Sequence, residues 1–324
     1  MRVKFSLELL PNESIDDILE LILIAEDIGF ENVWITDHYN NKNVFEVLAL
    51  AAYKTSTIHL GSGVSNPFIR NPITIAQATT TLDEISDGRA LIGIGPGDKA
   101  TMNTLGISWN KPLSTVRDAV ELIRDIIEGR EVKNGAKLTG TNKVQDKIPI
   151  YIGAQGPKML ELSGQIADGS LVNASNPKDF EHAIPLIKKG LSNSKDSDKN
   201  FNFAAYTACS VDNDKKTAFN QTKIVVAFII AGAPEVVLNR HGINLEAANK
   251  IKEFLSNNDF KNAANLVDED MVNAFSVWGT PSEINEKIDV LKTMGVNEFV
   301  VGSPIGKDRV KSLKLLEDVV NSFN

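Results

Sequence analysis

Short apolar runs alternate with amphipathic stretches along almost the whole chain. The stretch after the first run carries Ile15, Ile18 and Ile22, which are spaced as on one face of a helix. The apolar runs predict strands over residues 5–10, 33–36, 58–64, 89–94, 148–152, 169–173, 203–211 and 299–302. The amphipathic stretches predict helices over 44–53, 72–85, 114–128, 282–294 and 308–323, and further helices that begin near Ser14, Pro157 and Pro177.

Eight predicted strands interleaved with helices favour an α/β fold, a closed (β/α)8 TIM barrel with insertions, over an open sheet. A chain of 324 residues is long enough for one large barrel or for two ordinary domains. We expect a single barrel domain over residues 1–324. The surplus between the last two predicted strands, about 213–279, has a mostly helical pattern and is predicted to be an insertion.

Charge and composition exclude several kinds of partner. The 34 basic residues are outnumbered by 42 acidic ones, and a net charge of −8 disfavours nucleic acid, which needs a basic face. The longest apolar run, 224–233, is shorter than the ~20 residues that span a bilayer. The lone Cys209 allows no disulfide within the chain, which suits the cytoplasm, and the four scattered histidines predict no metal site.

Polar side chains follow two of the predicted strands. In a parallel barrel, chemistry takes place where the carboxyl ends of the strands meet the loops. Asp37 and His38 follow the second strand, and Asp98 follows the fourth. His38 is suited to donate a hydrogen bond or a proton to a bound ring. Asp37 either belongs to that site or holds its loop by bonding backbone N–H groups.

Glu8 lies within the otherwise apolar first strand, on the face that also carries Ser6. Because burial disfavours the charged form of a carboxylate, a buried Glu8 would suit a general acid near neutral pH. The alternative interpretation is an exposed glutamate near the end of the strand.

Glycine-rich segments occur at several predicted strand ends. Gly61 and Gly63, both in the third strand, indicate a bulge or a close approach of the backbone to a ligand. Gly93–Asp98 lacks the spacing of a nucleotide motif, so we interpret it as a turn that brings its aspartate to the barrel mouth. Gly153–Pro157 and Asn173–Pro177 lead into helix N-termini, whose N–H groups suit an anionic cofactor tail.

These motifs, in this order, resemble one family closely. The stretches Thr36–Asn41 and Gly93–Ala100 are long and specific, and the match extends from Glu8 to the C-terminal helix. On these residues the chain is similar to the methylenetetrahydromethanopterin reductases of methanogens, members of the bacterial-luciferase-like superfamily.

The resemblance implies a (β/α)8 barrel that binds coenzyme F420, an 8-hydroxy-5-deazaflavin, non-covalently at its mouth. It also implies homodimers or homotetramers, and a non-proline cis peptide at Gly63–Val64 behind the deazaflavin. The turns 153–156 and 175–176 would hold the phosphate tail. The cofactor-binding residues that the resemblance implies are Asp37, His38, Gly63, Val64, Ser65, Gly153, Ala154, Gln155, Gly156, Ser175 and Asn176.

The implied reaction is reversible hydride transfer from reduced coenzyme F420 to methylenetetrahydromethanopterin, which gives methyltetrahydromethanopterin. Opening the five-membered ring of the substrate leaves an amine nitrogen that needs a proton, and Glu8 is the candidate acid. Asp98 is the second candidate catalytic residue, either positioning the pterin or sharing the proton relay.

Three alternatives remain open. One is a flavin mononucleotide-dependent monooxygenase of the same superfamily, which would consume oxygen. Another is an F420-dependent alcohol or sugar-phosphate dehydrogenase, which a substrate assay would identify. The third is a non-catalytic ligand-binding barrel, against which the set of Glu8, His38 and Asp98 argues.

Overall fold

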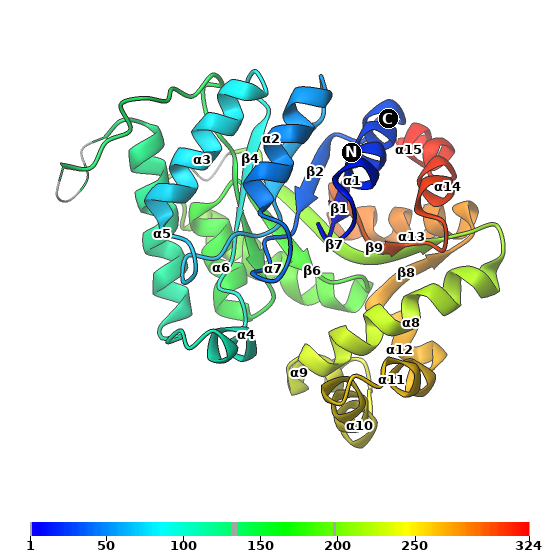
Figure 1. Ribbon diagram of the computed structural model, residues 1–324. Coiled ribbons are helices and arrows are strands. Elements are labelled where there is room, and N and C mark those ends of the chain that lie inside the picture. The colour runs from blue at the N-terminus through cyan, green and yellow to red at the C-terminus, as the bar shows by residue number, and fades with distance from the viewer. Residues whose placement is uncertain (1, 131, 133–134, 197–198, 324) are drawn as a thin grey trace. The chain divides into compact units, whose positions relative to one another are not determined.

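The computed structural model describes residues 2–130, 132, 135–196 and 199–323 (Figure 1). The strands are β1 (Lys4–Leu9), β2 (Asn32–Ile35), β3 (His59–Ser62), β4 (Ala90–Ile94), β5 (Ile150–Ala154), β6 (Gly169–Asn173), β7 (Asn202–Val211), β8 (Ser276–Gly279) and β9 (Glu298–Ile305). The helices are α1 (Ile15–Asp27), α2 (Val44–Lys54), α3 (Pro72–Ile85), α4 (Lys99–Thr104), α5 (Pro112–Ile127), α6 (Pro157–Ile166), α7 (Pro177–Ser192), α8 (Lys215–Gly232), α9 (Glu235–Arg240), α10 (Leu245–Ser256), α11 (Phe260–Leu266), α12 (Glu269–Phe275), α13 (Pro281–Met294), α14 (Arg309–Lys314) and α15 (Glu317–Phe323).

The described strands belong to one sheet in the order β6-β5-β4-β3-β2-β1-β9-β7-β8, and β6 also pairs with β7. Because of this additional pairing, the strands β1 to β7 and β9 form a closed barrel. Strand β8 pairs in parallel with the end of β7, from Ala208↔Ser276 to Val211↔Gly279. Neighbouring strands from β1 to β6 also run parallel. The fold is therefore the (β/α)8 barrel that the sequence predicted.

Three elements differ from the prediction. Strand β8 lies at the end of the segment that was predicted as mostly helical. It has only four residues, too few for the alternation of apolar and polar positions that identifies a strand in the sequence. Helix α4 lies in a stretch predicted as a polar loop, because it buries only Met102 and so has no apolar stripe. The predicted helix over 308–323 is divided into α14 and α15.

Backbone contacts divide the chain into two compact units. The first unit contains the residues up to Phe5, Asn173–His182 and the chain from Ala205 onward, and the second contains Ser6–Val172 and Ala183–Ala204. In the first unit, helices α8 to α12 gather around an apolar core of their own (Figure 1), which includes Val226, Ile230, Leu238, Ile251, Met271, Phe275 and Trp278. This core gives the helical segment a packing partner within its own unit.

Strand register in the second unit sets one layer of interior side chains. Glu8 is opposite Trp34, Trp34 is opposite Gly61, and Gly61 is opposite Leu91. The fully buried indole of Trp34 packs edge-on against Tyr151, with ring centroids 4.9 Å apart. A β-carbon at position 61 would lie 2.6 Å from Cζ3 of Trp34 and 2.9 Å from Cβ of Leu91. Glycine at this position therefore makes room for the indole that lies next to Glu8 in the sheet.

We predict that Gly61→Ala destabilises the protein by about 1–3 kcal/mol, because a closely packed interior must shift to admit the methyl group. The change is measured by urea unfolding. Gly140→Ala is the matched control, since a β-carbon at position 140 meets no atom within 4 Å. An unchanged midpoint for Gly61→Ala would contradict this account of the interior layer.

Candidate functional site

A pocket of about 160 Å³ lies at the carboxyl ends of β2, β3 and β4 in the second unit. Its walls come from the segments that follow these three strands, and they comprise Asp37, His38, Tyr39, Gly63, Val64, Asn66, Ile69, Gly97, Asp98, Thr101 and Met102. The pocket brings together five of the residues that the sequence singled out, namely Asp37, His38, Gly63, Val64 and Asp98. It lies at the strand ends where a parallel barrel places its chemistry.

The Asp37 carboxylate is held within the protein. Its side chain is 8% exposed, and its two oxygens accept hydrogen bonds from Nε and Nη2 of Arg70, at 2.7 and 2.9 Å. Oδ2 also accepts a hydrogen bond from Oγ of Ser65 at 2.9 Å. These bonds join the loop after β2 to the loop after β3. Of the two interpretations of Asp37, they match the one in which it holds its loop, although through side chains rather than backbone N–H groups.

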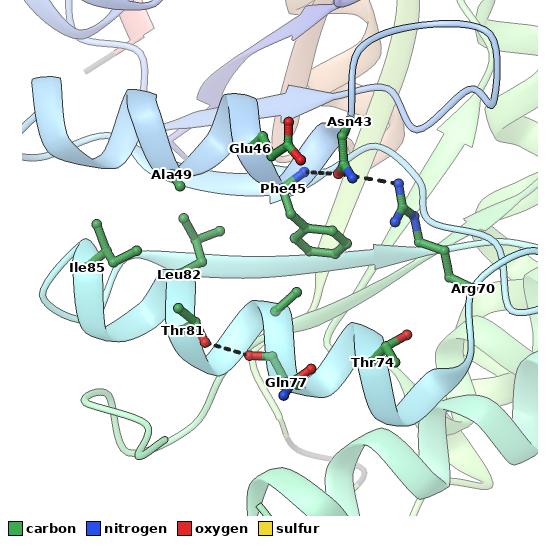
Figure 2. Close-up of a pocket in the computed structure, with 11 residues that line it drawn as sticks. Asn43, Phe45, Glu46, Ala49, Arg70, Thr74, Gln77, Thr81, Leu82 and Ile85 are labelled. Atoms are coloured by element: carbon green, nitrogen blue, oxygen red, sulfur yellow. Dashed lines mark hydrogen bonds between the residues drawn. The ribbon is translucent and has the colours of Figure 1, made fainter. Parts of the chain in front are cut away.

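Arg70 extends from the loop after β3 into a groove between α2 and α3 (Figure 2). Its guanidinium lies 5.4 Å from the centroid of the Phe45 ring, and Nη2 donates to Oδ1 of Asn43 at 3.5 Å. The hydrogen bond to Asp37 raises the pKa of Arg70. The two-pronged Arg–Asp contact fixes the direction of the carboxylate as well as its position. Sequence reasoning missed Arg70, which belongs to no motif.

The Gly63–Val64 peptide bond is cis, as the resemblance implied. The Val64 side chain lies against three glycines, namely Gly93 on β4, Gly95 directly after β4 and Gly153 on β5. A β-carbon at Gly95 would lie 2.7 Å from Cγ2 of Val64, and one at Gly153 would lie 3.3 Å from both methyl groups. A β-carbon at Gly93 would come within 3.1 Å of Cγ1. The glycines of the 93–98 segment therefore serve packing around Val64 as well as the turn that the sequence indicated.

Asp98 caps a helix at the edge of the pocket. Oδ1 accepts the N–H of Thr101 at 2.8 Å, and Oδ2 accepts the hydroxyl of the same residue at 2.7 Å. Asp98 is exposed and is the N-cap of α4. Its local role is thus to begin the short helix that forms one wall of the pocket.

Glu8 is buried, with 7% of its surface exposed, so the alternative of an exposed glutamate is wrong. It lies on the face of β1 that also carries Ser6, whose hydroxyl accepts a hydrogen bond from Nδ2 of Asn32 at 3.1 Å. Glu8 is not among the residues that line the 160 Å³ pocket. Register instead places it opposite Trp34, on the neighbouring strand β2.

Thr36 is a further candidate that the sequence analysis did not single out. Its hydroxyl is buried and has no hydrogen-bond partner within the described residues. Thr36 lies two residues beyond Trp34 along the strand direction, directly before Asp37. A buried hydroxyl without a partner is costly, so Thr36, which follows β2 and does not line the 160 Å³ pocket, is a candidate to bond a polar group of a ligand. The only sequence signal is a threonine where an apolar strand ends.

The 153–156 turn joins β5 to α6 in the second unit. Gly156 is the exposed N-cap residue of α6, and its carbonyl accepts hydrogen bonds from Met159 and Leu160 at 3.0 Å each. Gln155 is exposed as well, while Ala154 is buried at the end of the strand. A β-carbon at position 156 would meet no atom within 4 Å, so the helix start is open on this side.

The 175–176 turn lies in the first unit and is fixed there by its side chains. The Ser175 hydroxyl donates to the carbonyl of Phe275 at 3.2 Å, and Nδ2 of Asn176 donates to the carbonyl of Asn273 at 3.1 Å. Oδ1 of Asn176 accepts the N–H of Lys178 at 3.0 Å and so caps α7. These bonds anchor the start of α7 on the end of α12.

An ion-pair cluster adjoins this turn. Asp179, in the first turn of α7, is paired with Nη1 of Arg240 at 2.7 Å and with Nε2 of His241 at 3.0 Å. The His241 ring packs edge-on against Phe275, at 5.2 Å between centroids. The cationic partner of Asp179 offsets a negative charge that would oppose an anion at the start of α7. This cluster could not be predicted from sequence patterns, because its partners are about 60 residues apart.

The described residues contain no group of three or more His, Cys, Asp or Glu that could hold a metal ion. Within the same residues, no helix is both long enough and apolar enough to cross a membrane.

Residues 3–298 match the family model of the luciferase-like monooxygenases. The chain is 46% identical over 326 residues to the 5,10-methylenetetrahydromethanopterin reductase of Archaeoglobus fulgidus, with 97% of each chain covered. It is 47% identical over 344 residues to the enzyme of the same name from Methanopyrus kandleri, with 99% of each chain covered. The solved structure of the coenzyme F420-dependent tetrahydromethanopterin reductase from Methanopyrus kandleri matches with a TM-score of 0.91, at 46% identity and with 100% of each chain covered. The chain therefore belongs to the family of 5,10-methylenetetrahydromethanopterin reductases, within the luciferase-like monooxygenases.

Proposed function

We propose that the chain catalyses the reversible reduction of 5,10-methylenetetrahydromethanopterin to 5-methyltetrahydromethanopterin, with reduced coenzyme F420 as hydride donor. The observation that supports this most strongly is 46% and 47% identity to named reductases over almost the entire chain. The reaction is a step of one-carbon metabolism and methanogenesis. Reduced coenzyme F420 supplies the hydride, and the protein holds the donor and acceptor carbons about 3–3.5 Å apart.

The pocket at the ends of β2 to β4 suits one end of the deazaflavin. Gly63 and Val64 present backbone at its floor, and His38 and Tyr39 are exposed beside it. The unpartnered Thr36 hydroxyl offers a hydrogen bond to a polar edge of the ring. In this proposal His38, Gly63, Val64 and Ser65 hold the ring, and Asp37 holds Ser65 in place.

Two strand-to-helix turns, each taken within its own unit, are our candidates for binding the phosphate tail. In the second unit, Gly153, Ala154, Gln155 and Gly156 lead into the open start of α6. In the first unit, Ser175 and Asn176 lead into α7, whose acidic Asp179 is paired with Arg240. The exposed N–H groups of helix N-termini favour anions.

Glu8 is our candidate for the acid that protonates the amine nitrogen released when the substrate ring opens. Its burial in an interior layer supports this role, since burial favours the protonated form of a carboxyl group. Asp98 is proposed to position the pterin or share the proton relay from its place at the start of α4.

We also propose a single barrel domain with the helical segment 213–279 as its insertion, assembled as a homodimer or homotetramer in the cytoplasm. What supports assembly is a set of large exposed apolar side chains, namely Leu50 and Tyr53 on α2 and Ile85 on α3. Exposed apolar patches of this kind are typical of interfaces between chains.

Anaerobic mixing tests the activity directly. The purified protein with reduced coenzyme F420 and methylenetetrahydromethanopterin should restore the absorbance of the oxidised deazaflavin, with one methyltetrahydromethanopterin formed per cofactor oxidised. The same protein with reduced flavin mononucleotide and oxygen should consume no oxygen above the rate without protein. Oxygen consumption without turnover of the pterin would favour the monooxygenase instead.

Glu8→Gln should lower the turnover number by about 10²–10⁴-fold, because an amide cannot donate the proton. The dissociation constant of coenzyme F420, measured by absorbance titration, should stay within about twofold of wild type, since the change is nearly isosteric. Glu84→Gln, on the exposed surface of α3, is the control. Near-normal turnover of Glu8→Gln would remove Glu8 from the acid role.

Arg70→Met should raise the dissociation constant of coenzyme F420 by about tenfold, because the buried Asp37 loses the fork that directs it toward Ser65. The dissociation constant of Arg70→Lys should fall between those of wild type and Arg70→Met, since an ammonium group cannot bind both carboxylate oxygens as a guanidinium does. Arg130→Met is the matched control, because the Arg130–Asp125 pair has the same 2.7 Å distance but is exposed. Lower thermal stability with unchanged cofactor affinity would mean that Arg70 only supports the fold.

A further inference from the structure

A second, larger cleft of about 680 Å³ lies in the second unit, at the amino ends of β5 and β6. Lys147 comes before β5 and Asp168 comes directly before β6. The candidate cofactor pocket is at the opposite, carboxyl ends of the strands. The cleft is bounded by one face of α5, the end of α6 and the segment after α7.

Six cationic side chains line this cleft in a protein whose net charge is −8. They are Arg117, Arg124, Arg130, Lys147, Lys195 and Lys199. The acidic side chains in the lining are Glu121, Asp125, Asp168 and Asp196. The cleft is therefore a local region of positive charge on an acidic protein.

Part of this charge is used to hold the cleft together. Asp168, 8% exposed, accepts hydrogen bonds from Nη2 of Arg124 at 2.8 Å and from Nζ of Lys147 at 2.5 Å. Oδ2 also accepts the N–H of Ile150 at 2.9 Å. The two cations and these hydrogen bonds hold the pKa of Asp168 below its usual value, even though burial acts to raise it. One carboxylate with two cations leaves this group with one positive charge.

Lys199 adds an ammonium group that no carboxylate of the described residues pairs with directly. Its Nζ donates to Oγ of Ser194 at 3.3 Å and lies 5.7 Å from the centroid of the Phe201 ring. Burial lowers the pKa of Lys199 most, the opposite charges of Asp168 and Asp196 act to raise it, and the like charges of Arg124 and Lys147 lower it. Arg117, on α5, is partly exposed in the same cleft and also forms no ion pair within the described residues.

We propose that this cleft is a binding site for a multivalent phosphate group, either inorganic diphosphate or the phosphate of a small metabolite. Guanidinium groups bind phosphate oxygens in pairs, and lysine ammonium groups bind them as point charges. A cleft of about 680 Å³ is within the range of small-molecule sites. The anion would lie between Arg117 and Lys199, next to the positive Asp168 cluster. This site does not depend on the proposed reductase activity.

Calorimetric titration with inorganic diphosphate tests the site. The protein is first saturated with coenzyme F420, so that its phosphate tail fills its own site, and ionic strength is held constant with KCl. Wild type should bind one diphosphate per chain. Lys199→Gln and Arg117→Gln should each raise the dissociation constant about tenfold or more, while turnover with the pterin stays unchanged. Glycerol 3-phosphate in a parallel titration tells whether an esterified phosphate is preferred.

Lys216→Gln, an exposed change on α8 in the other unit, is the matched control and should bind like wild type. A heat of binding that does not saturate up to about 10 mM diphosphate would overturn the proposal, because the dissociation constant would then be weaker than that of ordinary metabolite sites. Equal affinities for wild type, both variants and the control would overturn it too. The same titration is repeated without coenzyme F420. Binding of diphosphate can then be judged even if the cofactor itself fails to bind.

Discussion

The candidate site depends on space that missing β-carbons leave in the strands of the second unit. Gly61 admits the indole of Trp34 into the interior layer, Gly95 and Gly153 make room for the side chain of Val64, and Gly93 makes room for the backbone carbonyl of Ser62. The contact between Gly61 and Trp34 places Trp34 beside Glu8. The contacts of Val64 hold the loop that follows β3 against β4 and β5. Close packing fixes both, because interiors at crystal-like density have few alternative arrangements.

Charged side chains in this protein hold loops in position at least as much as they offer chemistry. The Asp37–Arg70 pair ties together the loops after β2 and β3 in one unit, and the Asp179–Arg240 pair anchors the start of α7 in the other. Both carboxylate oxygens of Asp98 accept hydrogen bonds from Thr101, in the first turn of α4. Among the polar side chains that line the pocket, His38 and Tyr39 are exposed. A site of this kind orients a reactive cofactor and adds little chemistry beyond a proton.

The barrel was predictable because strand and helix periods alternate from the first residue, and long elements such as α3 (Pro72–Ile85) agree with their prediction at both ends. Asp37, His38 and Asp98 were found because they follow predicted strands, and parallel strands bring such residues to one edge. Gly63 was found as a glycine within a predicted strand, and Val64 through the family resemblance. Arg70 and Arg240 were not predicted, since their importance comes from partners that only the folded chain brings near. Thr36 was not predicted because the sequence does not show that its hydroxyl is buried without a partner. Strand β8 and helix α4 were missed because short elements show no period.

We propose that Glu8, buried beside Trp34, gives up a proton as the substrate accepts a hydride. The pH dependence of the single-turnover rate of cofactor oxidation tests it most directly. With an acid in the reaction, the rate of the wild-type protein falls as pH rises through one ionisation, and this fall is absent in Glu8→Gln, which reacts slowly at every pH. The same fall in both proteins would contradict the account and assign the proton to another group.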